Sequence, residues 1–107
     1  GAPAADAPLL KAGQPRWLLR ELGPGFTLLV FGPAPAWARD LDLLVVDIDR
    51  AALADAQGLA AQRYDARPGT TYLLRPDHHV AARWRAPGAA DVRAAIHHAL
   101  AHVGAEA

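Results

Sequence analysis

The first half of the chain contains two short segments in which almost every residue is apolar. They are FTLLVF, residues 26–31, and LLVVDID, residues 43–49, the second of which ends in acidic residues. Short apolar runs bounded by glycine or by charge are typical of strands that are buried on both faces of a sheet. The segment between them, GPAPAWARDLD, predicts one or two helical turns around Trp37. We therefore expect two parallel, central strands joined by a short helical crossover.

The second half of the chain predicts a β-hairpin. TYLLRPDHHVAARW, residues 71–84, has two strand-like runs around a turn in which Pro76 fixes φ and Asp77 hydrogen-bonds back to the chain. We expect this hairpin to add antiparallel strands to the central pair. Before it, the alanine-rich residues 50–64 predict a helix that is interrupted near Gly58.

The last part of the chain predicts an amphipathic helix. Apolar residues recur there at positions i, i+3, i+4, i+7, i+8 and i+11, namely Val92, Ala95, Ile96, Ala99, Leu100 and Val103. This spacing places them on one helix face, and Asp91 near the start suits the helix dipole. The expected order is β-α-β-α-β-β-α, which is an α/β, thioredoxin-like fold with a central mixed sheet of about four strands flanked by helices.

The N-terminal part of the chain differs in composition from the rest. Residues 1–15, GAPAADAPLLKAGQP, are rich in Ala, Pro and Gly and predict a linker that leads into the domain and docks through Leu9 and Leu10. The domain itself is expected to span residues 16–107, and it begins with RWLLREL, a helical or extended segment. The chain contains no methionine, and we expect it to be a piece of a longer protein.

Composition excludes several classes of function. Eleven basic residues balance eleven acidic ones, which argues against a nucleic acid or an anionic membrane as partner. The apolar runs are far shorter than the roughly 20 residues of a membrane-spanning helix, and no signal peptide is visible, so we expect a cytoplasmic protein. Cysteine and serine are both absent, which excludes disulfides, thiolate ligands and serine nucleophiles. Ten arginines against one lysine indicate a GC-rich bacterial genome.

The histidines raise the question of a metal site. His98 and His102 are spaced i, i+4 and share a helix face, as zinc-binding pairs do. A third ligand would have to come from His78, His79 or an acidic residue, and no recognisable spacing supplies one. We therefore interpret His98 and His102 as polar residues at the solvated boundary of the helix, and His78 and His79 as exposed turn residues. We predict no metal site.

Carboxylate pairs and aromatic residues give no active site either. Asp40 and Asp42, like Asp47 and Asp49, are spaced i, i+2, but they lie at the ends of an apolar strand, where solvated acids are common. No glycine-rich segment has the G-x-G-x-x-G or Walker spacing that cradles phosphate. The tryptophans are interpreted as packing residues instead of base-stacking platforms, namely Trp17, Trp37 and Trp84. We predict no catalytic and no cofactor-binding residue.

Two motifs together carry a resemblance to a known family. The first is GFTLL, in which Gly25, Phe26 and Thr27 begin the strand that precedes Trp37. The second is an Arg-Pro-Asp-x-x-Val-Ala-x-Arg hairpin, formed by Arg75, Pro76, Asp77, Val80, Ala81 and Arg83, with Trp84 adjacent. Both motifs and the linker resemble the C-terminal domain of FAD-dependent aromatic-ring hydroxylases, in the phenol hydroxylase and 3-(3-hydroxyphenyl)propionate hydroxylase group. The family usually has Gly or Gln where this chain has His78.

The resemblance implies a role within a larger enzyme. The parent would be a flavoprotein monooxygenase that uses FAD and NAD(P)H to insert one oxygen atom into a phenolic ring. Its flavin and substrate sites would lie in N-terminal domains, so this fragment would bind no cofactor and catalyse nothing. The motif residues would then be structural, and the domain would pack on the parent's other domains or form a homodimer. The Arg-Pro-Asp turn and Trp84 are a hypothetical contact surface for those domains.

Two alternatives stay open at the level of sequence. The chain could be a standalone thioredoxin-like binding or scaffold protein, or a small metal-dependent protein that uses its histidines. Redox activity of the thioredoxin type is excluded in each case, because GPAP, residues 32–35, occupies the place of Cys-x-x-Cys. Thr70 occupies about the place of the cis-proline. Upstream sequence and a metal analysis separate these alternatives, since the fold alone hosts many functions.

Overall fold

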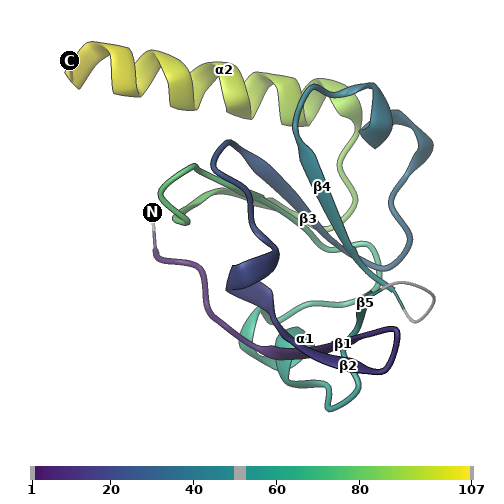
Figure 1. Ribbon diagram of the computed structural model, residues 1–107. Helices are drawn as coiled ribbons and strands as arrows, with labels where there is room; N and C mark the ends of the chain where they lie inside the picture. The colour runs from purple at the N-terminus through teal and green to yellow at the C-terminus, as the bar shows by residue number, and fades with distance from the viewer. Residues whose placement is uncertain (1, 50–52, 107) are drawn as a thin grey trace.

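The fold is built on a four-stranded mixed sheet (Figure 1). The computed structural model describes residues 2–49 and 53–106, with side chains to residue 101. The strand order is β4-β3-β6-β7, with β3 at Thr27–Phe31, β4 at Leu44–Ile48, β6 at Thr71–Leu74 and β7 at Val80–Trp84. Strands β3 and β4 are parallel, whereas β6 is antiparallel to both β3 and β7. Both apolar runs and the hairpin therefore form strands, as predicted.

One expectation about this sheet is wrong. The parallel pair was expected at its centre, but β4 lies at an edge and the central strands are β3 and β6. The reason is that the hairpin pairs with the free side of β3, where Leu28 lies opposite Leu73. Among the described residues no strand pairs with the other side of β4, and the half-buried Asp47 places a charge on this strand, which is a common protection of edge strands.

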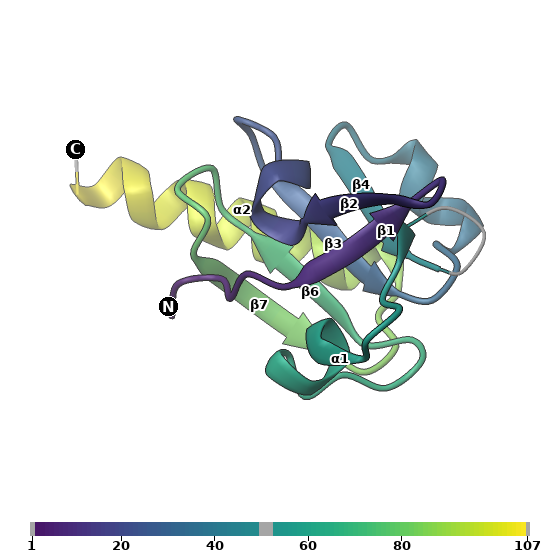
Figure 2. The same cartoon turned by 60° about the horizontal axis from the view of Figure 1, so that its bottom comes forward.

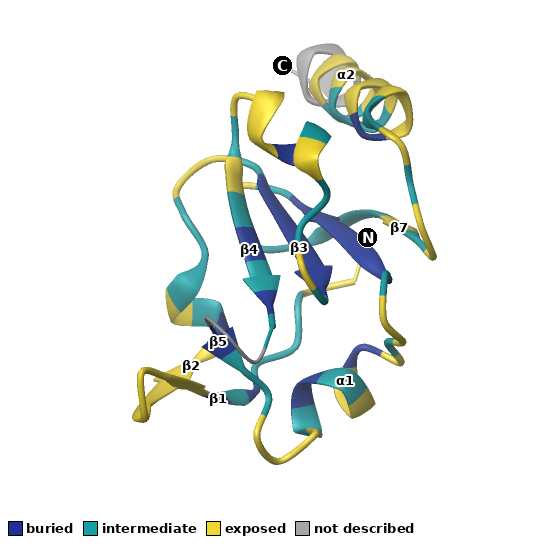
Figure 3. Ribbon diagram, turned by 90° about the vertical axis from the view of Figure 1, so that its right-hand side faces the viewer, coloured by how far each residue is buried: buried dark blue, intermediate teal, exposed yellow. Residues whose placement is uncertain are grey.

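Both faces of β3 are buried, and alternate residues serve different layers (Figure 3). Leu28 and Val30 belong to the core cluster that includes Val92 of the long C-terminal helix. Leu29 and Phe31 belong to the cluster on the opposite face, under the N-terminal part of the chain. This alternation follows from the two-residue period of a strand. The continuous apolar run in the sequence thus corresponds to a strand covered on both faces.

A second, smaller sheet covers the face opposite the long helix (Figure 2). Its order is β2-β1-β5, with β1 at Pro8–Lys11, β2 at Gln14–Trp17 and β5 at Leu53–Ala54. The predicted linker, residues 1–15, therefore contains ordered strand, and its boundary lies inside β2. The expected docking through two leucines holds for Leu9, which is 2% exposed, but not for Leu10, which is 37% exposed.

The helices are shorter than the sequence suggests, with one exception. They are the 3-10 turns η1 at Leu18–Glu21 and η2 at Ala36–Asp40, and the α-helices α1 at Leu59–Arg63 and α2 at Ala89–Glu106. The turn around Trp37 is confirmed. Of the helix predicted over residues 50–64, only α1 is formed, and residues 50–52 lie outside the described residues.

Two local features explain the late start of α1. Leu53 pairs with Lys11 and so belongs to β5. Gly58 has a φ of 70°, a left-handed conformation that glycine adopts without strain. The carboxylate of Asp55 then accepts the N–H groups of Ala60 at 3.1 Å and Ala61 at 2.9 Å, which caps the helix.

Helix α2 uses only part of its apolar face. Val92 is fully buried and Ile96 is half-buried against the sheet, but Leu100 is 56% exposed. Figures 1 and 2 show the reason, because α2 continues past the end of the sheet that it covers. The side chain of Val103, the last predicted member of this face, is not described. Within the part of the chain that the structure describes, no helix has the length and apolarity needed to cross a membrane.

The first residues of the chain are fixed to the body by several hydrogen bonds. We call residues 2–7 the leading segment. The hydroxyl of Tyr64 donates to the carbonyl of Ala5, and the guanidinium of Arg63 donates to the carbonyl of Asp6 at 2.8 Å. The carboxylate of Asp6 accepts the N–H of Leu19 at 3.0 Å. Burial raises the pKa of Tyr64 to about 12, with smaller contributions from Tyr72 and Asp6, so the hydroxyl stays a donor at neutral pH.

Replacing Tyr64 with Phe should release the leading segment. The variant keeps the ring but loses the donor to Ala5, so we expect the free energy of unfolding to fall by about 1 kcal/mol. Amide hydrogen exchange at Ala4, measured by NMR, should become faster. The control is Tyr72→Phe, which removes a hydroxyl that donates to the carbonyl of Tyr64 at 2.6 Å. Equally fast exchange at Ala4 in both variants would contradict this role of Tyr64.

Candidate functional site

The Arg-Pro-Asp motif forms the turn between β6 and β7. The N–H of His78 donates to the carbonyl of Arg75 at 2.9 Å, and the N–H of Arg75 donates to the carbonyl of His79 at 2.8 Å. His78 has a φ of 63°, in the left-handed region where a side chain other than glycine is strained. The turn therefore keeps its shape although the residue that best suits it is absent.

An ion pair inside the motif holds the turn together. The guanidinium of Arg75 donates two hydrogen bonds to the carboxylate of Asp77, the one from Nε to Oδ1 being 3.0 Å long. The same Oδ1 accepts the N–H of His79 at 3.3 Å. The hydrogen bond from Arg75 is the main reason that the pKa of Asp77 is lowered to about 2. The spacing of Arg75 and Asp77 around a proline is thus a structural device for closing the turn.

The leading segment pairs with the C-terminal side of this turn. The N–H of Ala4 donates to the carbonyl of His78, and the N–H of Val80 donates to the carbonyl of Ala2, both at 2.8 Å. Pro3 and His79 form an isolated antiparallel bridge. Together with the Tyr64 hydroxyl, these bonds fix the direction in which the chain approaches the sheet. The sequence does not predict this contact, because backbone pairing between distant segments leaves no local signal.

The remaining hairpin residues point to two different faces of the sheet. Val80 packs against the cluster under the leading segment. The guanidinium of Arg83 lies 5.5 Å from the centre of the Tyr72 ring and donates to the carbonyl of Asp65 at 2.6 Å. It also forms an ion pair with the Asp65 carboxylate at 3.5 Å. Arg83 therefore connects the hairpin to the turn that precedes it, which is a packing role.

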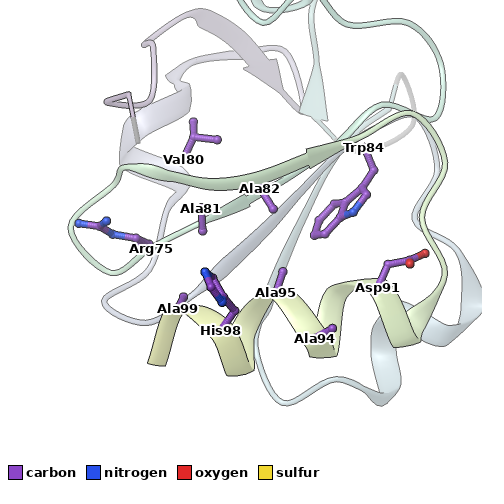
Figure 4. A pocket seen from close by; sticks show the side chains of 10 residues that line it. All are labelled: Arg75, Val80, Ala81, Ala82, Trp84, Asp91, Ala94, Ala95, His98 and Ala99. Carbon is purple, nitrogen blue, oxygen red and sulfur yellow. The ribbon is translucent and has the colours of Figure 1, made fainter. Parts of the chain in front are cut away.

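Trp84 lies on the opposite face, in a groove between β7 and α2. Figure 4 shows the indole projecting from the strand toward the helix, with Arg75 at the other end of the groove. The groove has a volume of about 590 Å³. The other residues that line the groove are mostly apolar, with a polar side chain near each end of the helical wall. They are Val80, Ala81, Ala82, Ala94, Ala95, Ala99, Asp91 and His98. The structure thus brings Arg75 and Trp84 of the motif to one open surface.

The first motif lies elsewhere and is mainly part of the core. Thr27 is 1% exposed, and its hydroxyl accepts the N–H of Gly23 at 3.4 Å. Phe26 and Trp37 are half-buried against the cluster that contains Val92. A Cβ at Gly25 would meet no atom within 4 Å, so packing does not require glycine there.

The candidate metal and acid–base residues do not converge. Within the described residues, no three His, Cys, Asp or Glu side chains are close enough to hold a metal ion. His98 lines the groove, and the side chain of His102 lies outside the described residues. His78 and His79 are half-buried, which corrects the expectation that both are exposed. The ring of His79 lies within 3.1 Å of the Asp77 carbonyl and is used inside the hairpin.

The four aspartates of the carboxylate pairs lie around β4, where Asp40 and Asp42 line one hollow beside α2 and Asp47 lines a different one. Asp40 and Asp42 are exposed, whereas Asp47 and Asp49 are half-buried. The groove beside Trp84 includes none of them. The interpretation of these acids as solvated residues at strand ends fits Asp40 and Asp42, but Asp47 lies within β4, opposite Val30, and is half-buried.

Protonation of Asp77 should open the turn only in strong acid. Its pKa of about 2 lies below the ordinary value of about 3.9, so the folded turn favours the carboxylate. The ion pair is fully formed above about pH 4 and is lost as the pH falls toward 2. Carbon-detected NMR of the carboxyl group should give a midpoint near pH 2, and Arg75→Gln should move that midpoint up toward the ordinary value. A native midpoint at the ordinary value would contradict the role of the ion pair.

Comparison with known proteins identifies similar solved structures. No protein-family model and no curated protein sequence matches the chain. It is similar to aklavinone-11 hydroxylase, which was solved in a ternary complex with FAD and aklavinone. The TM-score is 0.65 and the sequence identity is 26%. The match covers 83% of this chain but only 18% of the hydroxylase chain. It is also similar to the flavin-dependent monooxygenase PieE, which was solved with FAD and substrate. The TM-score is again 0.65 and the sequence identity is 28%, and the match covers 80% of this chain but only 17% of the PieE chain.

A third structure supports the fold. Peroxidoxin BcpB from Mycobacterium tuberculosis has a TM-score of 0.57 and 21% identity over 78% of this chain and 83% of that chain. This likeness confirms the predicted thioredoxin-like α/β fold and carries no function. The chain spans less than a fifth of each flavoenzyme that it matches. It resembles the C-terminal part of FAD-dependent monooxygenases, as the two sequence motifs predicted.

Proposed function

We propose that this chain is the non-catalytic, C-terminal thioredoxin-like domain of an FAD-dependent, NAD(P)H-using phenolic monooxygenase. The supporting observation is the match of about four-fifths of the chain to a small part of two flavoenzymes. Residues 1–15 would lead from the parent's N-terminal FAD and substrate domains into residues 16–107. The arginine-rich composition supports a bacterial parent, which we propose to be cytoplasmic.

The chain's own helix ends do not fit a dinucleotide. A pyrophosphate binds where the N–H groups of a helix N-terminus are free and the local charge is positive. At α2 the carboxylate of Asp91 accepts the N–H of Gly88 at 2.9 Å, and at α1 the carboxylate of Asp55 caps the first turn. The Asp55 carboxylate occupies first-turn donors that a phosphate would need, and both carboxylates repel the charge of a phosphate. FAD and NAD(P)H would therefore bind to the parent's other domains.

The proposed role of the domain is structural. The leading segment is fixed against the hairpin turn by backbone hydrogen bonds, so a chain entering there would meet a rigid body. Beside that turn, the groove presents Arg75 and Trp84 on one surface. Tryptophan and arginine are the residues most enriched among energetically dominant interface contacts. We propose that the parent's other domains cover this groove.

The first test concerns cofactors and the gene. Titration of the purified chain with FAD, followed by its absorption spectrum, should show no binding, and metal analysis should give less than stoichiometric metal. The reading frame upstream should encode a strand followed by G-x-G-x-x-G. Aklavinone-11 hydroxylase serves as the positive control for flavin binding. Stoichiometric flavin or metal in the chain, or a start codon directly before Gly1, would overturn the proposal.

The second test concerns the groove. In the full-length enzyme, Arg75→Ala with Trp84→Ala should loosen domain docking by about 2 kcal/mol or more, seen as faster limited proteolysis between the domains. The matched control is Arg16→Ala with Trp17→Ala, a neighbouring Arg and Trp exposed on β2. Thermal unfolding of the same variants in the isolated chain separates lost docking from lost folding. Unchanged proteolysis of the groove variant would contradict docking at this surface.

A further inference from the structure

A separate hollow lies where the leading segment meets α1 and the β6–β7 hairpin. Its volume is about 310 Å³, which lies in the range of small-molecule pockets. We call it the arginine hollow and define it by the residues that line it, namely Ala2, Pro3, Ala5, Arg63, Tyr64, Tyr72, Val80 and Arg83. Figure 1 shows the N-terminal chain and α1 together on the side of the sheet away from α2. The arginine hollow shares only Val80 with the groove beside Trp84.

Both arginines bring their guanidinium groups to this hollow. Arg63 donates to the carbonyl of Asp6 at 2.8 Å, so its guanidinium lies against the leading segment. The guanidinium of Arg83 lies 5.5 Å from the centre of the Tyr72 ring, which also lines the hollow. Two cationic groups, one from α1 and one from β7, therefore border the same space.

The protein neutralises little of this charge. Within the residues that the structure describes, Arg63 forms no ion pair. Arg83 pairs with Asp65 at 3.5 Å, but the Asp65 side chain is 89% exposed, and water screens such an exposed pair. The carboxylate of Asp6 accepts backbone N–H groups instead. No acid is among the residues that line the hollow, so the space between the arginines favours an anion.

The rest of the wall limits the kind of anion. The hydroxyl of Tyr64 donates to Ala5 and that of Tyr72 donates to Tyr64, so the arginines supply the donors for an anion. Ala2 and Val80 add apolar surface. A water molecule takes up roughly 30 Å³ of liquid, so the hollow has room for about ten non-hydrogen atoms. A ligand that fits therefore combines an oxyanion with a compact apolar body.

We propose that the arginine hollow binds a small organic carboxylate. Its two oxygens accept hydrogen bonds from Arg63 and Arg83, which match carboxylate geometry, and its apolar body lies against the leading segment. Two arginines less the single charge of Asp65 leave one positive charge. That suits a carboxylate better than a phosphate monoester, which carries about −1.5 to −2. Because the ligand contacts α1, the hairpin and the leading segment together, its binding holds the leading segment in place.

An NMR titration of the 107-residue chain with phenylacetate tests the site. Phenylacetate has the charge and about the size that the hollow accepts. We expect one molecule per chain with a Kd on the order of millimolar, since so small a ligand gains little affinity. Phenylacetamide, which lacks the charge, and acetate, which lacks the apolar body, should each bind at least about tenfold more weakly. Absence of phenylacetate binding, or equal binding of phenylacetamide, would overturn the proposal.

Substitution of the arginines tests where the anion binds. Arg63→Gln and Arg83→Gln should each raise the Kd for phenylacetate at least about tenfold. The matched control is Arg67→Gln, an exposed arginine that does not line the hollow, which should leave the Kd unchanged. Arg63 is itself exposed and donates to a backbone carbonyl, so its variant tests the site even if Arg83→Gln fails to fold. An unchanged Kd in Arg63→Gln, or an equal loss in the control, would contradict this site.

Amide hydrogen exchange tests the link to the leading segment. The N–H of Ala4 donates to the carbonyl of His78, and saturating phenylacetate should slow its exchange. Amides around Trp84 should keep their rates, because Asp91 in that groove repels a carboxylate. Unchanged exchange at Ala4 in the bound state would contradict the proposed position of the ligand.

The full-length enzyme distinguishes a small molecule from an acidic side chain of the parent's other domains. In equilibrium dialysis, Arg63→Gln should remove one bound phenylacetate per chain relative to the unchanged enzyme. No difference would mean that the parent itself fills the hollow, and it would overturn a small-molecule ligand. The titrations of the isolated chain involve no flavin and no upstream sequence, so their failure is distinct from failure of the flavoenzyme assignment.

Discussion

The structure depends on the burial of β3 on both faces. All five residues of this strand are buried, and exposing any one of its four apolar side chains to water would cost roughly 1.5–3 kcal/mol. One layer, α2, covers Leu28 and Val30, and a second layer must cover Leu29 and Phe31. The leading segment, the β1–β2 hairpin and α1 form that second layer. The N-terminal part of the chain is therefore required for the core and is more than a connection to it.

The same requirement explains how much of the fold the sequence predicts. Continuous apolar runs identify β3 and β4, and the proline-aspartate turn identifies the β6–β7 hairpin, because these signals are local. The β1–β2 hairpin is missed because every residue of β2 is exposed. Its turn uses Ala12 with a φ of 51° beside Gly13 with a φ of 78°, where Asn-Gly would be the recognisable signal. β5 is missed for a related reason, since Leu53 becomes a strand residue only by pairing with Lys11.

The candidate site, like the fold, is only partly predictable from the sequence. Arg75, Pro76 and Asp77 could be assigned to the turn from their spacing, whereas the ion pair between Arg75 and Asp77 was found only in the structure. The contact of the leading segment with His78 and Val80 could not be predicted, because it consists of backbone hydrogen bonds between residues far apart in the chain. Tyr64 carries no motif either, and only its position beneath Ala5 makes its hydroxyl a structural donor.

The two open surfaces have a common physical origin in α2. Of its described side chains, only Val92 is fully buried, so the helix contacts the sheet along a narrow line. A helix that contacts a sheet along such a line leaves a hollow on each side, one toward β7 and one toward β4. The first is lined by alanines and contains the motif's Arg75 and Trp84, while the second carries exposed leucines with charges of both signs. Because the two hollows lie on opposite flanks of α2, a molecule that covers one of them leaves the other accessible.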